Sequence, residues 1–330
     1  RQRPYEPFIA DVIAPAGASL DAAIATAAFR VGDARVDRNE KARARFKAAY
    51  DAYIAAVPGG QAKTDGIAAG EATASAVLTA RSNDNFFNSA AYVNSTAHPG
   101  AWQAVTAAVP HATAGANDYA VAFAIPLTAS SPDARRIRPA LSLTDARYKH
   151  DFDETKLYGA LQSKVRTAAM TDVVQFWTES GFTLWSRNVR DIVAARGLDE
   201  FEAARALAAF SVATGDAMLA CFDAKYAHRF WRPWQAIRHA GGTDTTQSSH
   251  DTAWTPTVRA NHPEYPAGHG CYAGSGTKAL ELLFGDFAVT LTGTGNQVVG
   301  HPVVSKATYR SLDAINDDNA NARVWGGLHW

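Results

Sequence analysis

Apolar residues recur every three or four positions along several segments of the chain, and this spacing is typical of α-helices with one buried face. The earliest run ends at Phe29 and has Ser19 and Asp21 at its start, where helix caps are common. A second run stops at Pro58, and a third precedes a polar stretch. The pattern predicts helices over residues 19–29, 37–57 and 65–80.

Beyond these segments the periodicity is lost and Ser, Thr and Asn become frequent. Residues 82–150 are therefore predicted to form a long irregular connection with one short strand at 119–125. The helical pattern returns from Lys156. Further helices are predicted over residues 171–177, 183–195, 199–225, 272–284 and 305–322.

Strand signals are otherwise scarce, whereas an α/β fold would need strands at regular intervals. We expect an all-α fold of helical bundles with long irregular loops, in a single domain over residues 1–330. Residues 1–150 would supply the N-terminal helices and the long loop, and residues 151–330 a helical core. A chain of 330 residues is long enough to bury such a core.

The charge balance excludes two classes of partner. Lys and Arg together number 32, as do Asp and Glu, so the formal net charge is +0. A general nucleic-acid or anionic-membrane binder would carry a cationic excess. We therefore expect no nucleic-acid partner. No run of about 18 uninterrupted apolar residues occurs, so we also expect no membrane span. The sequence leaves a homo-oligomer open.

Cys221 and Cys271 are the two cysteines, too few for a disulfide framework. They could form one bridge, but two reduced thiols are the preferred interpretation. Six histidines are predicted to lie in loops without metal-ligand spacing, so zinc is not expected. These are His98, His111, His150, His239, His250 and His301.

The first segment with candidate functional residues runs from Lys225 to Pro233 and contains several basic side chains. Lys225 and Arg232 are seven residues apart, which is two turns of a continuous helix, so both cations would project from nearly the same face. Two stacked cations repel each other unless an anion lies between them. The alternative is that each cation pairs with a carboxylate on a neighbouring helix.

The second segment spans residues 262–270 and contains two prolines. Gly268 lets a ligand approach the backbone, and His269 precedes a helix predicted to start near Tyr272. Backbone N–H groups at such a start bind anions. The alternative is an ordinary Pro/Gly turn with a capping histidine.

The third segment joins Arg323 to His329, six residues later. On a continuous helix these two side chains would point to different sides. Gly326 and Gly327 must therefore break the helix if Arg323 and His329 share a ligand.

Read in order, the segments are Lys-x6-Arg-Pro, Pro-x-Gly-His and Arg-x5-His. This arrangement resembles the oxyanion pocket of the superfamily that unites type 2 phosphatidic acid phosphatases with vanadium haloperoxidases. Residues 220–238 (ACFDAKYAHRFWRPWQAIR) and 261–274 (NHPEYPAGHGCYAG) are similar to the bacterial and plant branch of the haloperoxidases. The similarity extends over most of the chain, and it implies that family's helical-bundle fold.

The resemblance also implies a cationic cradle for a tetrahedral oxyanion, namely vanadate in haloperoxidases and phosphate in phosphatases. Lys225, Arg232 and Arg323 would donate charge-assisted hydrogen bonds to its oxygens. The backbone N–H of Gly268 would be a further donor. Ala267 stands where the family usually has Ser, and loss of that hydroxyl should cost on the order of 1.5–3 kcal/mol of oxyanion binding.

Three histidines receive roles from the same resemblance. His329 would be the axial vanadium ligand or, in a phosphatase, the nucleophile that becomes phosphohistidine. His269 would be the acid–base histidine. His262 lies where bromide-oxidising members carry a second histidine, while Phe222 stands where characterised members tend to have Trp.

A further departure concerns the end of the sequence. Family chains continue past the last motif, with an acidic residue that orients the histidine and with further helix. Here one residue follows His329. We expect either a truncated C-terminal region in a longer natural protein, or a poorly packed last segment.

The preferred function is a vanadate-dependent haloperoxidase-like oxidoreductase. It would use hydrogen peroxide to oxidise a halide, bromide rather than chloride, for transfer to a small organic substrate. One alternative is a soluble phosphatase with a phosphohistidine intermediate. Another is a weakly active oxyanion-binding homologue, which Ala267 keeps open.

Overall fold

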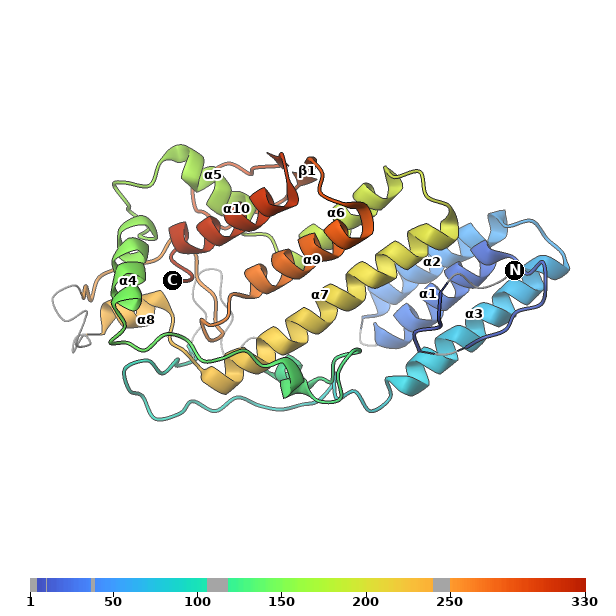
Figure 1. Cartoon of the computed structure of the whole chain (residues 1–330), viewed down its shortest axis with the longest axis horizontal. Helices are drawn as coiled ribbons and strands as arrows, with labels where there is room; N and C mark the ends of the chain where they lie inside the picture. The colour runs from blue at the N-terminus through green and yellow to red at the C-terminus, as the bar shows by residue number, and fades with distance from the viewer. Residues whose placement is uncertain (1–4, 10, 37–38, 106–117, 240–249) are drawn as a thin grey trace. The chain divides into compact units, whose positions relative to one another are not determined.

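The computed structural model describes residues 5–9, 11–36, 39–105, 118–239 and 250–330. Within these ranges the chain forms ten α-helices, two short 3-10 helices and one pair of strands (Figure 1). The expectation of a mainly helical fold is confirmed. The helices divide into two compact units, each of which is described separately below.

The first unit comprises Arg1–Asp84 and Gly197–Arg205. Its helices are the three predicted from periodicity, although residues 37–38 of the second prediction lie outside the described residues. Helix α1 packs closely against α3 because Gly66 and Gly70 leave room for its backbone. A Cβ atom on Gly66 would lie 2.3 Å from the carbonyl oxygen of Ser19. The helices are α1 (Leu20–Arg35), α2 (Glu40–Ala56) and α3 (Gln61–Ala80).

The second unit comprises Asn85–Arg196 and Ala206–Trp330 and contains all the residues singled out for function. Within it α10 packs against α9, α5 and α4, and α6 packs against α9 (Figure 1). Its helices are α4 (Ala146–Tyr158), α5 (Ala168–Phe176), α6 (Gly181–Ala194), most of α7 (Glu200–His228), α8 (Pro233–Arg238), α9 (Gly268–Phe284) and α10 (Leu312–Trp325).

Three elements of this unit differ from the sequence prediction. The predicted strand at 119–125 is the 3-10 helix η1 (Tyr119–Phe123), because Tyr119 packs into a cluster of aromatic rings instead of pairing with a strand. The predicted helix at 305–322 begins only at Leu312, where Ser311 caps it. Helix α4 begins at Ala146, inside the stretch predicted to be irregular and ten residues before the helical pattern was expected to return, because few apolar residues mark its buried face.

The two strands were also missed by the sequence prediction. β1 (Val289–Thr292) and β2 (Lys306–Tyr309) pair antiparallel, with Val289 opposite Tyr309. Each strand has four residues, too few for an alternating pattern to stand out from the surrounding sequence.

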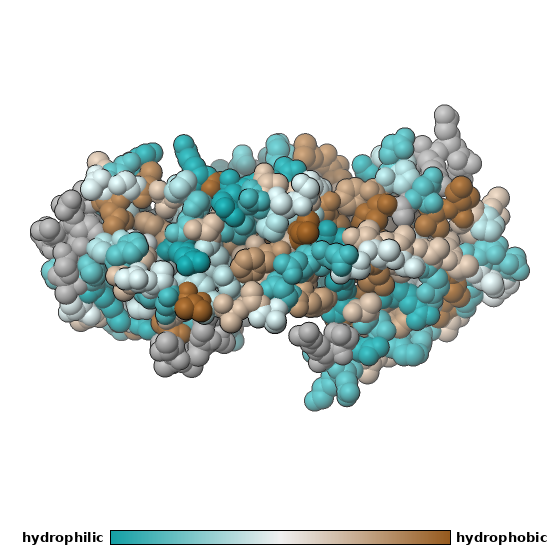
Figure 2. Space-filling model, turned by 90° about the horizontal axis from the view of Figure 1, so that it is seen from below, coloured by the Kyte–Doolittle hydropathy of each residue, from teal (hydrophilic) through white to brown (hydrophobic). Residues whose placement is uncertain are grey.

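Helix α7 is the one helix, within the described part of the chain, that has the length and apolar composition to cross a membrane. Half of its most apolar stretch is buried inside the structure, as in the core helix of a globular unit. On the face shown in Figure 2, hydrophobic residues are scattered among hydrophilic ones.

Candidate functional site

The three segments singled out from the sequence meet at one cavity of about 360 Å³ in the second unit. Lys225 does not line this cavity, but its buried ammonium lies behind the wall and donates to the carbonyl oxygens of Pro263, Glu264 and Pro266. Ala267 is the N-cap residue of α9, at the edge of the same wall. The predicted site residues that line the cavity are Arg232, His262, Gly268, His269, Arg323 and His329.

Lys225 and Arg232 reach the site by a different route from the predicted one. Helix α7 ends at His228, and Arg229 adopts a left-handed conformation with φ of 50° that turns the chain. Arg232 then caps the start of α8, with Pro233 as its first residue. The prediction that both cations project from one continuous helix face is wrong, because this turn redirects the chain between them.

The Arg232 guanidinium is buried and joins the second and third segments. Its Nε donates to the carbonyl oxygen of His262 at 2.7 Å, and its Nη1 donates to that of Leu328 at 2.8 Å. Nη1 also lies 2.9 Å from Nε2 of His329, and Nη2 lies 2.8 Å from Nδ1 of His262. Because a guanidinium can only donate, both imidazole nitrogens must accept.

Arg323 comes from the last turn of α10. Its Nη2 donates to the carbonyl oxygen of Trp177 at 2.6 Å, while its buried Nε has no hydrogen-bond partner among the described residues. The helix ends at Trp325, and Gly327 with φ of 73° turns the chain back. A Cβ on Gly327 would lie 2.7 Å from the carbonyl oxygen of Gly159, so only glycine fits this turn.

His329 is oriented by a carboxylate that sequence reasoning missed. Its Nδ1 lies 2.7 Å from Oε1 of Glu264. Since Nε2 accepts from Arg232, Nδ1 carries the proton and donates to Glu264. His329 is thus a neutral imidazole with its lone pair on Nε2, the form that binds metal ions. The expectation that His329 lacks an orienting carboxylate is wrong, since Glu264 in the second segment supplies one.

The end of the chain is packed, so the alternative of a poorly packed last segment is also wrong. Trp330 stacks on Phe152 at a centroid distance of 5.6 Å and meets Tyr148 edge-on at 5.3 Å. The hydroxyl of Thr155 donates to the carbonyl oxygen of His329 at 3.0 Å. Helix α4 therefore holds the third segment in place.

Helix α9 begins at Gly268, one turn earlier than predicted. The first N–H groups of a helix have no partner within it, and here Ala267 provides no side-chain cap. Gly268 lines the cavity, so the positive end of the helix dipole faces the space between the cations.

The buried charges of the site do not balance. Lys225, Arg232 and Arg323 are each at most 4% exposed, and the buried carboxylate of Glu264 acts on Lys225 and Arg232. Burial lowers the pKa of Lys225 well below its usual value, and the Arg232 charge lowers it further. Burial also lowers the pKa of Arg232 to about 10 and that of Arg323 to about 9, and it raises the pKa of Glu264 to about 7. Uncompensated buried cations are costly, and an anion in the cavity would compensate them.

The two remaining histidines are neutral in this arrangement. Burial, followed by the Arg323 charge, lowers the pKa of His269 to about 3. Nε2 of His269 lies 2.9 Å from the carbonyl oxygen of Glu179, so Nε2 carries the proton. Burial and the Arg232 charge hold the pKa of His262 well below its usual value. Its ring lies 5.6 Å from that of Phe222.

The comparisons with known proteins agree with this architecture. Residues 205–330 match the family model described as the VCPO second helical-bundle domain. The structure of a bacterial vanadium-dependent iodoperoxidase superposes with a TM-score of 0.71 and 21% identity, covering 92% of this chain and 74% of that one. No curated protein has a significantly similar sequence.

The chain has a vanadium haloperoxidase-like fold. Two further structures of a bacterial vanadium-dependent chloroperoxidase share it. The apo form has a TM-score of 0.61 and 19% identity, covering 93% of this chain and 78% of that one. The holo form has a TM-score of 0.64 and 17% identity, covering 92% and 77%.

Within this haloperoxidase-like fold, the donors around the cavity fit a tetrahedral oxyanion. The unpartnered Nε of Arg323 and the N–H groups at the start of α9 are donors, and Nε2 of His329 presents a lone pair. Arg232 can donate to an oxygen once Nη1 leaves Nε2. Lys225 differs from its expected role, because carbonyl oxygens occupy its ammonium and it contributes charge from behind the wall.

A disulfide joins Cys221 of α7 to Cys271 of α9, so the interpretation of two reduced thiols is wrong. One bridge was the alternative that the sequence left open, and the two cysteines reach bonding distance in the structure. They do so because α7 and α9 run side by side here, with the two Cα atoms 6.4 Å apart. The bond ties the helix that carries Lys225 to the helix that starts at Gly268.

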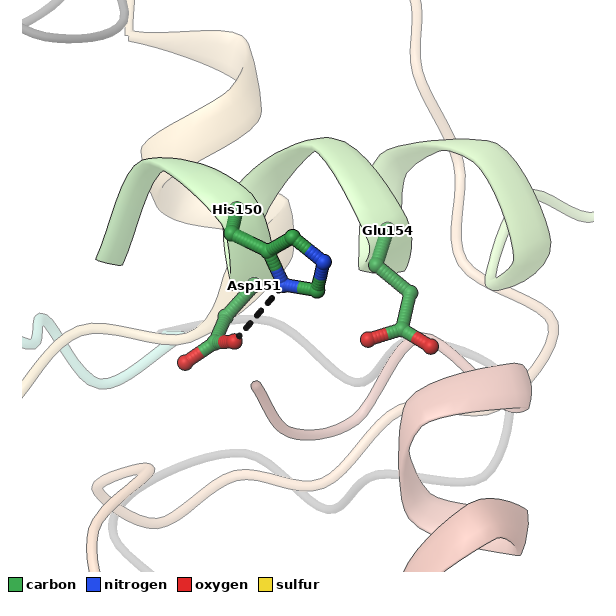
Figure 3. Close-up of side chains that lie close together, drawn as sticks. All are labelled: His150, Asp151 and Glu154. Atoms are coloured by element: carbon green, nitrogen blue, oxygen red, sulfur yellow. Dashed lines mark hydrogen bonds and ion pairs between the residues drawn. The ribbon is translucent and has the colours of Figure 1, made fainter. Parts of the chain in front are cut away.

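A second group of metal-binding side chains lies on α4, where His150, Asp151 and Glu154 have ligand atoms within 4.8 Å of one another (Figure 3). His150 was predicted to lie in a loop, while His111 lies outside the described residues. The imidazole is largely exposed and is hydrogen-bonded to Asp151 at 3.3 Å. We assign no metal to it, since exposed acidic groups commonly occur without one.

Replacing Glu264 with Gln should reveal the charge imbalance. The change removes the carboxylate among three buried cations, so we expect a loss of about 3 kcal/mol in the free energy of unfolding. Added phosphate should restore part of this loss by binding to the folded state. Urea unfolding with and without phosphate measures both effects.

Glu281→Gln, at an exposed ion pair with Lys278, is the matched control and should reduce the free energy of unfolding by less than about 0.5 kcal/mol. Equal losses in the two variants would contradict the imbalance.

The lowered histidine pKa values predict acid sensitivity of the anion-free protein. A histidine whose pKa is lower in the folded state than in the unfolded state contributes stability that is present above about pH 6.5 and is lost as the pH falls. For His269 the loss should continue toward pH 3. In urea unfolding between pH 6 and 4.5, His269→Gln should reduce the slope of stability against pH by about 1.4 kcal/mol per pH unit. An unchanged slope would show that His269 takes up protons in the folded protein.

Proposed function

We propose that this protein is a vanadate-dependent haloperoxidase-like oxidoreductase that uses hydrogen peroxide to oxidise a halide. The observation that carries the proposal is the buried excess of positive charge around a neutral histidine that lines the cavity and whose Nε2 lone pair accepts from Arg232. The vanadium haloperoxidase-like fold supports it. Bound vanadate would supply Lewis-acid activation of peroxide, so that peroxide takes two electrons from the halide.

The residues of this chain would divide the work of binding and positioning. His329 would hold the vanadate through Nε2, while Glu264 keeps the proton on Nδ1 and fixes the orientation of the ring. Arg232, Arg323 and the N–H of Gly268 would donate to the oxygens. The Lys225 charge would add attraction from behind the wall.

In this proposal His269 is the residue that accepts and donates protons. Its Nε2–H is engaged by the carbonyl oxygen of Glu179, which leaves Nδ1 as the atom able to accept a proton. A neutral imidazole can take the proton that hydrogen peroxide loses on binding. An anion in the cavity would raise its low pKa, because the pKa is depressed in part by Arg323.

We propose bromide rather than chloride as the halide. His262 lies at the wall of the cavity with its ring against Phe222. A soft apolar ring beside an imidazole suits a large and weakly hydrated halide better than a small and strongly hydrated one.

A phosphatase is the second candidate, and one observation favours it specifically. The Nε2 lone pair of His329 is held ready by Glu264 and could attack a phosphoryl group bound by the same donors. A weakly active oxyanion-binding homologue is the third reading, because Ala267 offers no hydroxyl at the N-cap of α9.

One assay separates these functions. Purified protein, with and without orthovanadate, is tested for peroxide-dependent bromination of a phenol and for hydrolysis of a phosphomonoester. The proposal predicts bromination only with vanadate, and vanadate inhibition of any hydrolysis. Vanadate-inhibited hydrolysis without bromination would establish the phosphatase, and binding of vanadate without either activity would establish the oxyanion-binding homologue.

Ala267→Ser should strengthen the site. Ala267 has the extended N-cap conformation, with φ of −71° and ψ of 117°, which serine adopts readily. The new hydroxyl can donate to an oxyanion at the start of α9, so vanadate affinity should rise about tenfold for each 1.4 kcal/mol regained. Vanadate titration of both variants, followed by bromination rate, measures this gain. Equal or weaker binding by the serine variant would show that Ala267 makes room for another ligand.

A further inference from the structure

The cavity is larger than one tetrahedral oxyanion requires. If each of four oxygens takes the volume of a water molecule, about 30 Å³, the anion fills about 120 Å³. The cavity measures about 360 Å³, near the lower end of the range for pockets that hold small organic molecules. More than half of the space therefore remains once the cradle is filled.

This remaining space has an aromatic wall at its exposed end. Phe182, near the start of α6, lines the cavity with 52% of its surface exposed, whereas Arg232 and Arg323 are at most 4% exposed. The Phe182 ring meets the buried Tyr272 ring edge-on at a centroid distance of 5.2 Å. Exposed hydrophobic residues occur elsewhere on the surface (Figure 2), so exposure alone assigns nothing to Phe182. The role proposed below for Phe182 depends on its position on the wall of this cavity.

A further cation of the cavity is the partly buried guanidinium of Arg259. Arg259 lines the cavity, and among the described residues it makes no hydrogen bond or ion pair; its contact is with the ring of Trp234, 5.7 Å away. The cavity also has a carboxylate, that of Asp118. Burial raises the pKa of Asp118, and this carboxyl acts electrostatically on Tyr226. Because no described residue accepts a hydrogen bond from the Arg259 guanidinium, its N–H groups can bind an anionic group.

We propose that the outer part of the cavity binds an aromatic ring that carries a carboxylate, while an oxyanion occupies the cradle. The ring lies against Phe182 and Tyr272, and the carboxylate binds Arg259. The bound molecule is then the substrate that is halogenated, and this assignment of a substrate class rests on the proposed function.

The reaction on such a substrate balances without a further reagent. Hydrogen peroxide takes two electrons from the halide, and with one proton from solvent its two oxygens leave as one water and one hypohalous acid. The aromatic ring then gains the halogen and releases a proton, which leaves with the hydroxide of the hypohalous acid as a second water. A hydroxyl on the ring makes it electron-rich enough for this substitution.

The test measures binding and needs no turnover. The probe 4-hydroxybenzoate is titrated calorimetrically into the anion-free protein and into protein saturated with phosphate. We expect binding of similar strength in both cases, since the two ligands occupy different parts of the cavity. Competition between phosphate and the probe would place the probe in the cradle and overturn the proposal.

Two variants assign the contacts. Arg259→Gln should weaken binding of 4-hydroxybenzoate by about tenfold while leaving 4-hydroxybenzyl alcohol unaffected, because only the former carries the carboxylate. Phe182→Ala should weaken both probes. Arg147→Gln, at an exposed arginine of α4 paired with Asp145, is the matched control and should change neither. Equal effects of Arg259→Gln on the two probes, or none, would overturn the proposal.

These outcomes are separable from the proposed function. If the probe binds as expected but vanadate supports no bromination, the proposed function fails and the aromatic carboxylate site stands. If vanadate supports bromination but the probe does not bind, the site fails and the proposed function stands. Phosphate affinity equal to that of the parent protein shows that each variant is folded.

Discussion

Three buried cations lie near one cavity in this protein, and the surrounding structure supplies the hydrogen bonds that make their burial tolerable. Lys225 is held by carbonyl oxygens of the second segment, and Arg232 by carbonyl oxygens of both the second and the third. The Glu264 carboxylate acts on both of these cations and also accepts from Nδ1 of His329. Taking ions out of water costs several kcal/mol each, and an anion in the cavity would offset part of that cost.

The backbone turns that create this arrangement are as important as the charges. The left-handed Arg229 ends α7 and sends Arg232 back toward the cavity, and Gly327 does the same for His329 after α10. Helix α4 holds the end of the chain through Phe152 and Thr155, and the disulfide ties α7 to α9. Two turns, helix α4 and the disulfide thus hold the elements around the cavity in place.

The sequence singled out residues that line one cavity, because three short motifs together resemble those of a known family. It also predicted most helices, since amphipathic runs such as that of α6 carry their own signal. It could not predict that Glu264 orients His329, because that contact joins residues 65 positions apart and depends on both turns. The disulfide was missed for the same reason, as its two cysteines are 50 residues apart and only the packing of α7 against α9 brings them together.

A crystal structure of the protein grown with orthovanadate tests the central claim most directly. The account predicts one bound oxyanion per chain, bonded to Nε2 of His329, with Arg323 Nε and the N–H of Gly268 donating to its oxygens and with Nη1 of Arg232 released from Nε2. A cavity that holds no oxyanion under saturating vanadate, or an oxyanion bound away from His329, would contradict it.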